Sequence, residues 1–119
     1  MPLVRVEMRK GRSPEYKKTL LNCIHESLIK ALGIEDWDRF QRIVEIEAAD
    51  FEIPDGKTEN FMIIELELFP GRSKEQKAQA IARITELLGE RLEVAATDVF
   101  IVIHEPPLEN WGMAGKAKG

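Results

Sequence analysis

Apolar and charged residues alternate near the start of the chain, from Val4 to Arg9. A period of two is typical of a strand with one apolar and one polar face. Gly11 permits a tight turn after this strand, Ser13 can accept hydrogen bonds from the free N–H groups of a helix, and Pro14 suits the first helical position. The pattern therefore predicts a strand that leads through a short turn into a helix.

Helical spacing follows over residues 14–32. The apolar positions that recur on one helical face are Leu20, Leu21, Ile24, Leu28, Ala31 and Leu32. Gly33 is expected to end this helix, and alternation returns between Phe40 and Ile46. Because a helical crossover joins strands of the same direction, the second strand is predicted to lie parallel to the first.

The same succession occurs a second time. Residues 2–46 align without a gap with residues 62–106, at a constant offset of 60 positions. The identical pairs include Gly11/Gly71, Arg12/Arg72, Ser13/Ser73, Leu28/Leu88, Asp38/Asp98 and Phe40/Phe100. This self-similarity indicates a duplicated strand-helix-strand unit. Pro2 aligns with Met62, so any chemistry of a terminal proline would occur once per chain.

The second unit is predicted to run as a strand from Phe61 to Leu68, a turn at residues 70–72, and a helix that begins after Ser73 with capping-box spacing. Its expected buried face comprises Ile81, Ile84, Leu87, Leu88 and Leu92. The apolar run from Val99 to Ile103 is expected to be a strand buried on both faces.

We therefore predict an α/β (α+β) fold, with a four-stranded mixed sheet and two helices on one face. Residues 1–119 are expected to form one domain, built from repeats at 2–47 and 61–105 and a tail at 106–119. The tail is expected to be neither helix nor strand, with a loose end. Since two helices cover only one sheet face, the mixed second face favours a homo-oligomer.

Composition narrows the function classes. The formal net charge is −4 with both signs interspersed, which argues against nucleic-acid binding and against a polybasic membrane anchor. No apolar run is long enough for a membrane span, and the start of the chain does not resemble a signal peptide. We expect a cytoplasmic protein without cofactor or metal, in which Cys23, the single cysteine, is a small apolar residue.

Pro2 is the first candidate for chemistry. Its small size lets an aminopeptidase remove the initiator methionine, which would leave a secondary amine at the end of an apolar strand. Such an amine can act as a base once burial and nearby cations favour its neutral form. The alternative is that proline is merely a common second residue.

The terminal proline, the Gly-Arg-Ser turn into a helix, the duplication and a Trp-Gly-rich tail together resemble the tautomerase superfamily. The chain looks like two units of the 4-oxalocrotonate tautomerase type fused together. The resemblance implies a trimer with Pro2 as the catalytic residue. Fused members such as malonate semialdehyde decarboxylase carry a histidine where His25 stands and a segment similar to residues 38–41. Of their two carboxylate-binding arginines only Arg72 is matched, since the other falls at Phe69 or Pro70.

The expected catalytic residues are Pro2, Arg72 and Asp38, and the expected substrate-binding residues are Arg12, His25, Arg39 and Trp111. An arginine at a helix start can grip a carboxylate bidentately, although a solvated turn is the alternative. Asp38 could hold water or orient the amine, but its repetition as Asp98 also fits a carboxylate that closes a loop. His25 and Trp111 could instead only pack.

Three functions follow from this set. The first is a cofactor-free isomerase, in which neutral Pro2 removes a proton beside the carbonyl of a small 2-oxo acid or its enol. The second is a lyase, a decarboxylase or hydratase that uses cationic Pro2 with Asp38 and His25 handling water. The third is a non-catalytic ferredoxin-like binding module.

Overall fold

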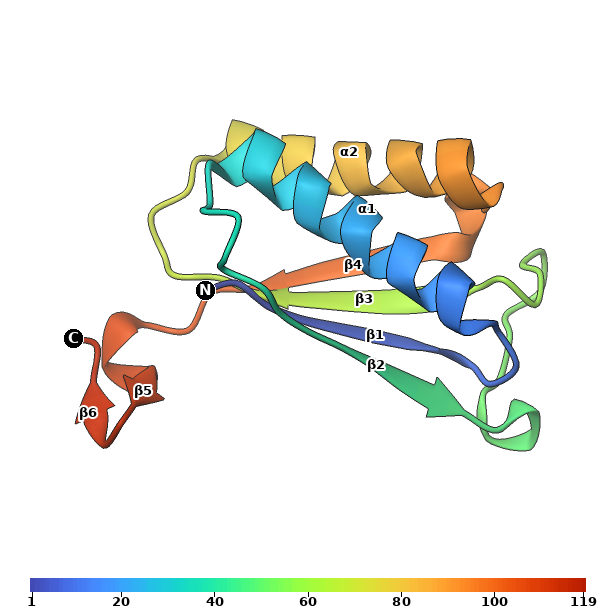
Figure 1. The fold of residues 1–119 in the computed structure, drawn as a ribbon, viewed down its shortest axis with the longest axis horizontal. Helices are drawn as coiled ribbons and strands as arrows, with labels where there is room; N and C mark the ends of the chain where they lie inside the picture. Colours follow the sequence, from blue (N-terminus) through green and yellow to red (C-terminus); the bar gives the residue numbers. More distant parts are fainter.

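The computed structural model describes all residues, 1–119. The main elements are β1 (Leu3–Arg9), α1 (Pro14–Leu32), β2 (Phe40–Ile46), β3 (Met62–Glu67), α2 (Lys74–Leu92) and β4 (Val99–His104). A tail follows with the short strands β5 (Gly112–Met113) and β6 (Lys116–Ala117). Figure 1 shows α1 and α2 side by side on one face of the sheet, with the other face open. The predicted fold class is confirmed.

The sheet has the strand order β2-β1-β3-β4. Each β-α-β unit pairs its own strands in parallel, β1 with β2 and β3 with β4, while β1 and β3 meet antiparallel at the centre. Alternate residues of β1 and β3 are buried beneath the helices, including Val4, Val6, Ile64 and Leu66. The period of two along the sequence therefore identifies the covered face of the central strands.

The two units are related by an approximate two-fold axis between β1 and β3. Arg5 lies opposite Glu65 in the antiparallel register, and these two positions are also equivalent in the repeat. The two side chains form an ion pair on the open face, where the Arg5 guanidinium holds the pKa of the Glu65 carboxyl below its usual range. The axis brings the start of one unit's first strand beside the end of the other's.

Both helices begin as their sequences predict, and α1 also ends as predicted. Ser13 accepts a hydrogen bond from the Tyr16 N–H, and Ser73 forms a complete capping box with Gln76. Gly33 ends α1 in the left-handed conformation. Ile81, expected on the buried face of α2, is instead 39% exposed, because Ala80 and Ile84 face the core at that turn.

Two other expectations are wrong for the single chain. The strand β4 lies at the edge of the sheet, and Phe100 is 57% exposed on the open face, so this strand is covered on one face only. The tail contains a 3-10 turn at Leu108–Asn110, and its end pairs in the β5-β6 hairpin. Positive φ values at Ala114 and Gly115 allow that tight turn, and no hydrophobic pattern in the sequence predicts it. No helix is long and apolar enough to cross a membrane.

Candidate active site

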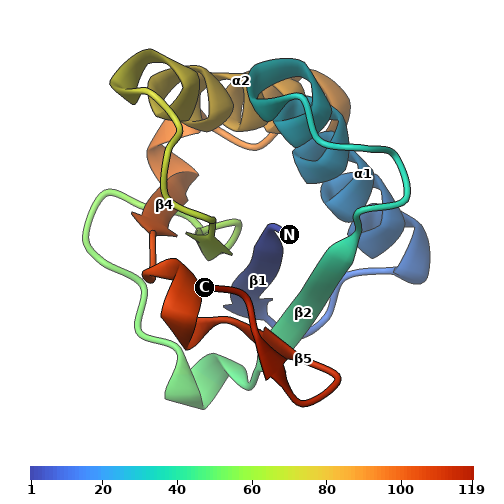
Figure 2. The same ribbon diagram turned by 90° about the vertical axis from the view of Figure 1, so that its left-hand side faces the viewer.

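One end of the sheet gathers most of the predicted site. β1 begins there with Pro2 before it, and β2 begins beside β1, since Leu3 lies opposite Phe40. β3 runs the other way and ends there, which carries the turn before α2, with Arg72, to the same end. Figure 2 looks onto this end and shows the N-terminus in the middle, with α2 above and the tail below.

The start of the chain is held by Asp38. Both Asp38 carboxylate oxygens lie 2.6 Å from the terminal nitrogen of Met1, in a half-buried ion pair. Pro2 itself is buried. Removal of Met1 would place the free amine one residue nearer the sheet, still at the end where Asp38 lies. This arrangement brings together two of the three predicted catalytic residues.

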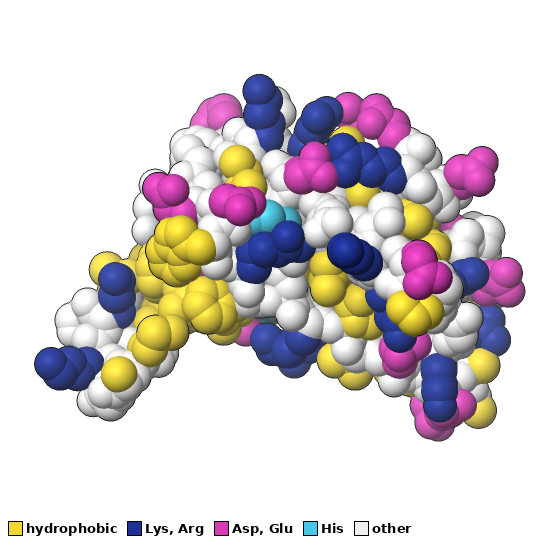
Figure 3. All heavy atoms as spheres, viewed as in Figure 1, with side chains coloured by type: hydrophobic (Ala, Val, Ile, Leu, Met, Phe, Trp, Pro, Cys, Tyr) yellow, Lys and Arg dark blue, Asp and Glu magenta, His cyan; other side chains and the backbone are white.

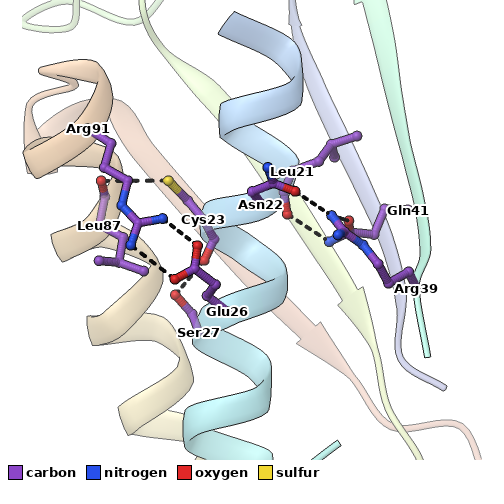
Figure 4. Close-up of polar contacts among 9 residues, drawn as sticks. All are labelled: Leu21, Asn22, Cys23, Glu26, Ser27, Arg39, Gln41, Leu87 and Arg91. Carbon is purple, nitrogen blue, oxygen red and sulfur yellow. Dashed lines mark hydrogen bonds and ion pairs between the residues drawn. The ribbon is translucent and has the colours of Figure 1, made fainter. Parts of the chain in front are cut away.

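His25 and Arg39 both hold the loop that carries Asp38. The His25 side chain is 3% exposed, and its Nε2 lies 2.9 Å from the Asp36 carbonyl oxygen, which can only accept a hydrogen bond. Figure 4 shows Arg39 donating to Asn22 on α1, at 2.8 Å, and to Gln41, at 3.1 Å. Within one chain, both side chains therefore anchor the loop that carries Asp38 to α1.

The two turn arginines lie at opposite ends of the sheet. Arg72 is half-buried at the Pro2 end. Arg12 follows the far end of β1, where its guanidinium donates to the side chain of Asn60 and lies over the Tyr16 ring at 5.2 Å. Within one chain the structure therefore brings Arg72, but not Arg12, toward Pro2.

Trp111 is packed within the tail at the same end. Its indole nitrogen donates to the Pro106 carbonyl oxygen at 3.0 Å, and its ring meets Phe69 edge-to-face with 4.8 Å between centroids. Phe69, with Pro70, is one of the two positions in the turn before α2 at which the resemblance would place the second clamp arginine. These contacts support a packing role for Trp111 in the single chain, with an apolar wall beside the turn that carries Arg72.

Asp98 shows what the repeated carboxylate does in the second unit. It is 1% exposed and accepts hydrogen bonds from the Thr58 N–H at 2.9 Å and the Thr58 hydroxyl at 2.5 Å. Both repeated aspartates thus bind the chain that precedes the first strand of their own unit. In the second unit that chain is the connector between β2 and β3, and in the first it is the N-terminus.

This difference gives a stability prediction. Asp98→Ala removes the buried carboxylate that accepts both hydrogen bonds from Thr58. Since hydrogen bonds to a charged group contribute more than neutral ones, we expect a loss of about 1.5–3 kcal/mol in the free energy of unfolding. Asp38→Ala is the matched control and should lose less, because Asp38 is only half-buried and binds a free chain end. Urea denaturation measures both, and an equal loss for the two variants would contradict the distinct roles.

A further ion pair joins the two helices. Figure 4 shows Arg91 on α2 paired with Glu26 on α1, and the hydrogen bond with Arg91 holds the pKa of the Glu26 carboxyl below its usual range. The Cys23 thiol is buried beside them, with its sulfur 3.7 Å from the Leu87 carbonyl oxygen, and burial raises its pKa. A raised pKa disfavours the reactive thiolate, which fits the structural role expected for Cys23.

Two features of the structure, the contact of Thr58 and the exposure of Trp37, are not predicted from the sequence. Thr58 lies in the connector, and its pairing with Asp98 depends on a contact across 40 positions. Trp37 precedes Asp38 and is strongly exposed. A lone tryptophan in a polar Glu-Asp-Trp-Asp-Arg run was the available signal. The structure groups no three His, Cys, Asp or Glu side chains as a metal site.

Comparisons with known proteins agree with this geometry. Two family models described as tautomerase enzymes match the chain, one over residues 38–114 and one over residues 2–57. A probable tautomerase of Bacillus subtilis, YusQ, is 29% identical over 99% of this chain and 98% of its own length. The 2-hydroxymuconate tautomerase of Comamonas testosteroni is 42% identical, over 40% of this chain and 76% of its own length.

Solved structures give the same fold. The FG41 malonate semialdehyde decarboxylase, inhibited by 3-bromopropiolate, has a TM-score of 0.84 and 30% identity, covering 94% of this chain and 88% of that one. A native fused 4-OT has a TM-score of 0.88 at 20% identity, covering 98% and 95%. With a family model matched over most of its length, a duplicated β-α-β sheet and a buried penultimate proline, the chain belongs to the tautomerase family.

Proposed function

We propose that the protein is a cofactor-free tautomerase of a small 2-oxo acid or its enol, with Pro2 as the general base. The observation that carries this proposal is the common location of Pro2, Asp38 and the turn of Arg72 at one end of the sheet. Removal of Met1 would turn the buried Pro2 nitrogen into a secondary amine. An amide nitrogen at that place would have no useful basicity.

The proposed reaction assigns a task to each group. Arg72 binds the substrate carboxylate and so places the carbon next to the carbonyl against the Pro2 nitrogen. Neutral Pro2 removes a proton from that carbon, or from the enol hydroxyl, and returns it at the other position. Asp38 orients the amine, and His25 and Arg39 keep Asp38 in place through the loop of residues 35–39.

A lyase is the second candidate, and one contact favours it. Asp38 lies against the chain terminus, and a carboxylate there favours the cationic form of an amine. The similarity to a malonate semialdehyde decarboxylase, at 30% identity over 94% of the chain, supports the same candidate. In that reaction cationic Pro2 would polarise a carbonyl group while Asp38 handles water.

The protonation state of Pro2 decides between the two. Arg72 and burial favour the neutral amine, and Asp38 opposes them. We expect neutral Pro2, as the tautomerase mechanism requires, with a Pro2 pKa below about 7.5, against about 8 for an ordinary α-amine. Titration of nitrogen-labelled proline by NMR, on protein whose intact mass begins at Pro2, measures this directly. A pKa above about 8.5 would instead support the lyase.

We also propose that the active enzyme is a homotrimer. The open sheet face exposes Phe40, Val44 and Phe100, which are apolar and have no cover within one chain. Fused 4-OT structures of the same fold are described as trimers, which supports this assembly. Light scattering coupled to size exclusion should give three chains per particle. A monomer at micromolar concentration would contradict the proposal.

A further inference from the structure

The loop between α1 and β2 presents a tryptophan to solvent beside the Pro2 site. Trp37 is 74% exposed, the largest exposed fraction among the large exposed hydrophobic side chains of the protein. It immediately precedes Asp38, whose carboxylate holds the chain terminus. An indole left in water keeps a large apolar surface unburied, and burial of that surface by a ligand is favourable.

The exposure of Trp37 does not come from a loose loop. The Asp38 N–H donates to the Glu35 carbonyl oxygen at 3.1 Å, and the Arg39 N–H donates to the Trp37 carbonyl oxygen at 2.9 Å. His25 and Arg39 tie the same loop to α1 from both sides. The backbone that carries the indole is therefore fixed relative to Asp38, as a binding wall requires.

The tryptophan is specific to the end of the sheet that carries Pro2. The repeat places Thr97 at the equivalent position in the second unit, beside the fully buried Asp98. That unit has no free terminus, and its aspartate is occupied by Thr58 of the connector. Of these two equivalent loop positions, only the one in the unit with the terminal amine carries an exposed aromatic.

The surroundings at this end are apolar as well. Leu108 and Met113 of the tail are exposed. Figure 3 shows hydrophobic side chains gathered over this end of the sheet and along the tail, whereas charged groups are scattered over the helices. A ligand held by its carboxylate at Arg72 would therefore meet apolar surface with the rest of its body.

We propose that Trp37 is a specificity-determining residue, whose indole stacks on an aromatic substituent of the 2-oxo acid substrate. The inference rests on the proposed function, since it places the carboxylate at Arg72 and the reacting carbon at Pro2. The substrate class is then an aryl-substituted 2-oxo acid or its enol. Stacked or edge-to-face aromatic pairs add to the free energy gained by burial alone. The Trp37 indole would therefore discriminate against an aliphatic acid of the same charge.

Binding of unreactive acids tests the proposal without turnover. The probes are 3-phenylpropionate and propionate, which share the carboxylate and differ in the ring. We expect Trp37→Ala to raise the dissociation constant of 3-phenylpropionate by about threefold to tenfold and to leave that of propionate unchanged. Thr97→Ala, the matched control at the equivalent position, should change neither. Equal affinity of 3-phenylpropionate for Trp37→Ala and the parent protein would overturn the proposal.

Fluorescence gives a second readout from the residue itself. The chain has two tryptophans, so Trp111→Phe leaves Trp37 as the only indole. We expect its emission to shift to shorter wavelength with 3-phenylpropionate and not with propionate. No shift with either acid, or a change in subunit number on Trp37→Ala, would overturn the proposal, the second by assigning the indole to a subunit contact.

The two proposals fail separately. Stacking on Trp37 in an enzyme whose Pro2→Ala variant keeps its activity would refute the proposed base and not the aromatic wall. Loss of activity in Pro2→Ala, together with ring-independent binding, would refute the wall alone.

Discussion

Replacing Pro2 by alanine is expected to lower the rate of ketonisation of an aryl enolpyruvate by about 10²–10⁴, the usual contribution of a general base. The variant keeps a terminal amine, but it loses the secondary amine and the fixed ring that orient the lone pair at the start of β1. The measurement is kcat at saturating substrate and kcat/KM at subsaturating substrate, with circular dichroism to show that the fold is retained.

The control for this variant is a check that its initiator methionine has been removed. Intact mass should show that both the parent protein and Pro2→Ala have lost Met1, because a retained methionine would remove the amine altogether. A peak that includes Met1 in active parent protein would contradict the proposed base. Undiminished activity in Pro2→Ala would contradict it as well, even though the fold assignment would stand.

Arg72→Ala is expected to have the second largest effect, about 100-fold in kcat/KM. A guanidinium that holds a carboxylate by charged hydrogen bonds contributes about 1.5–3 kcal/mol, and tenfold corresponds to about 1.4 kcal/mol. We expect the loss chiefly in KM, since the carboxylate is bound in ground state and transition state alike. Arg72→Lys should recover only part of it, because an ammonium group cannot form the bidentate pair.

The repeat supplies the control. Arg12 has the same residue type at the equivalent turn position, but it lies at the opposite end of the sheet and donates to Asn60. Arg12→Ala should therefore leave kcat/KM within about threefold of the parent value, inside the range of a site without contact to substrate. Comparable losses for the two variants would show that a second chain carries Arg12 to the Pro2 site.

The hydrophobic periodicity of the sequence was sufficient to predict the main helices and strands, because the interactions that define them are local. Alternation fixed which side of β1 is buried, because successive side chains of a strand point to opposite faces. The bounds of α1 follow from Ser13, Pro14 and Gly33, which act on the backbone within one turn. Periodicity did not predict the β5-β6 hairpin of the tail. That hairpin depends on two residues with positive φ and on the hydrogen bond from the Lys118 N–H to the Trp111 carbonyl oxygen.

The candidate site divides along the same line. The sequence by itself determined that a single terminal proline begins an apolar strand, and that a carboxylate and an arginine recur at equivalent positions in two units. Only the tertiary structure decided which of the recurring residues lie together. The antiparallel contact of β1 with β3 places Arg72 at the end where Pro2 lies and Arg12 at the other, although both arginines stand in a Gly-Arg-Ser turn before a helix.

The same long-range contacts separated the two aspartates and exposed Trp37. Asp98 binds Thr58 because, in the second unit, the segment before the first strand is an internal connector. In the first unit the equivalent segment is the free chain end, and Asp38 binds its terminal nitrogen. The sequence made His25 a candidate site residue, and in the structure its Nε2 forms a hydrogen bond with the backbone carbonyl of Asp36, 11 positions away. Local spacing cannot encode such pairings, because they depend on how distant segments pack once the hydrophobic core has formed.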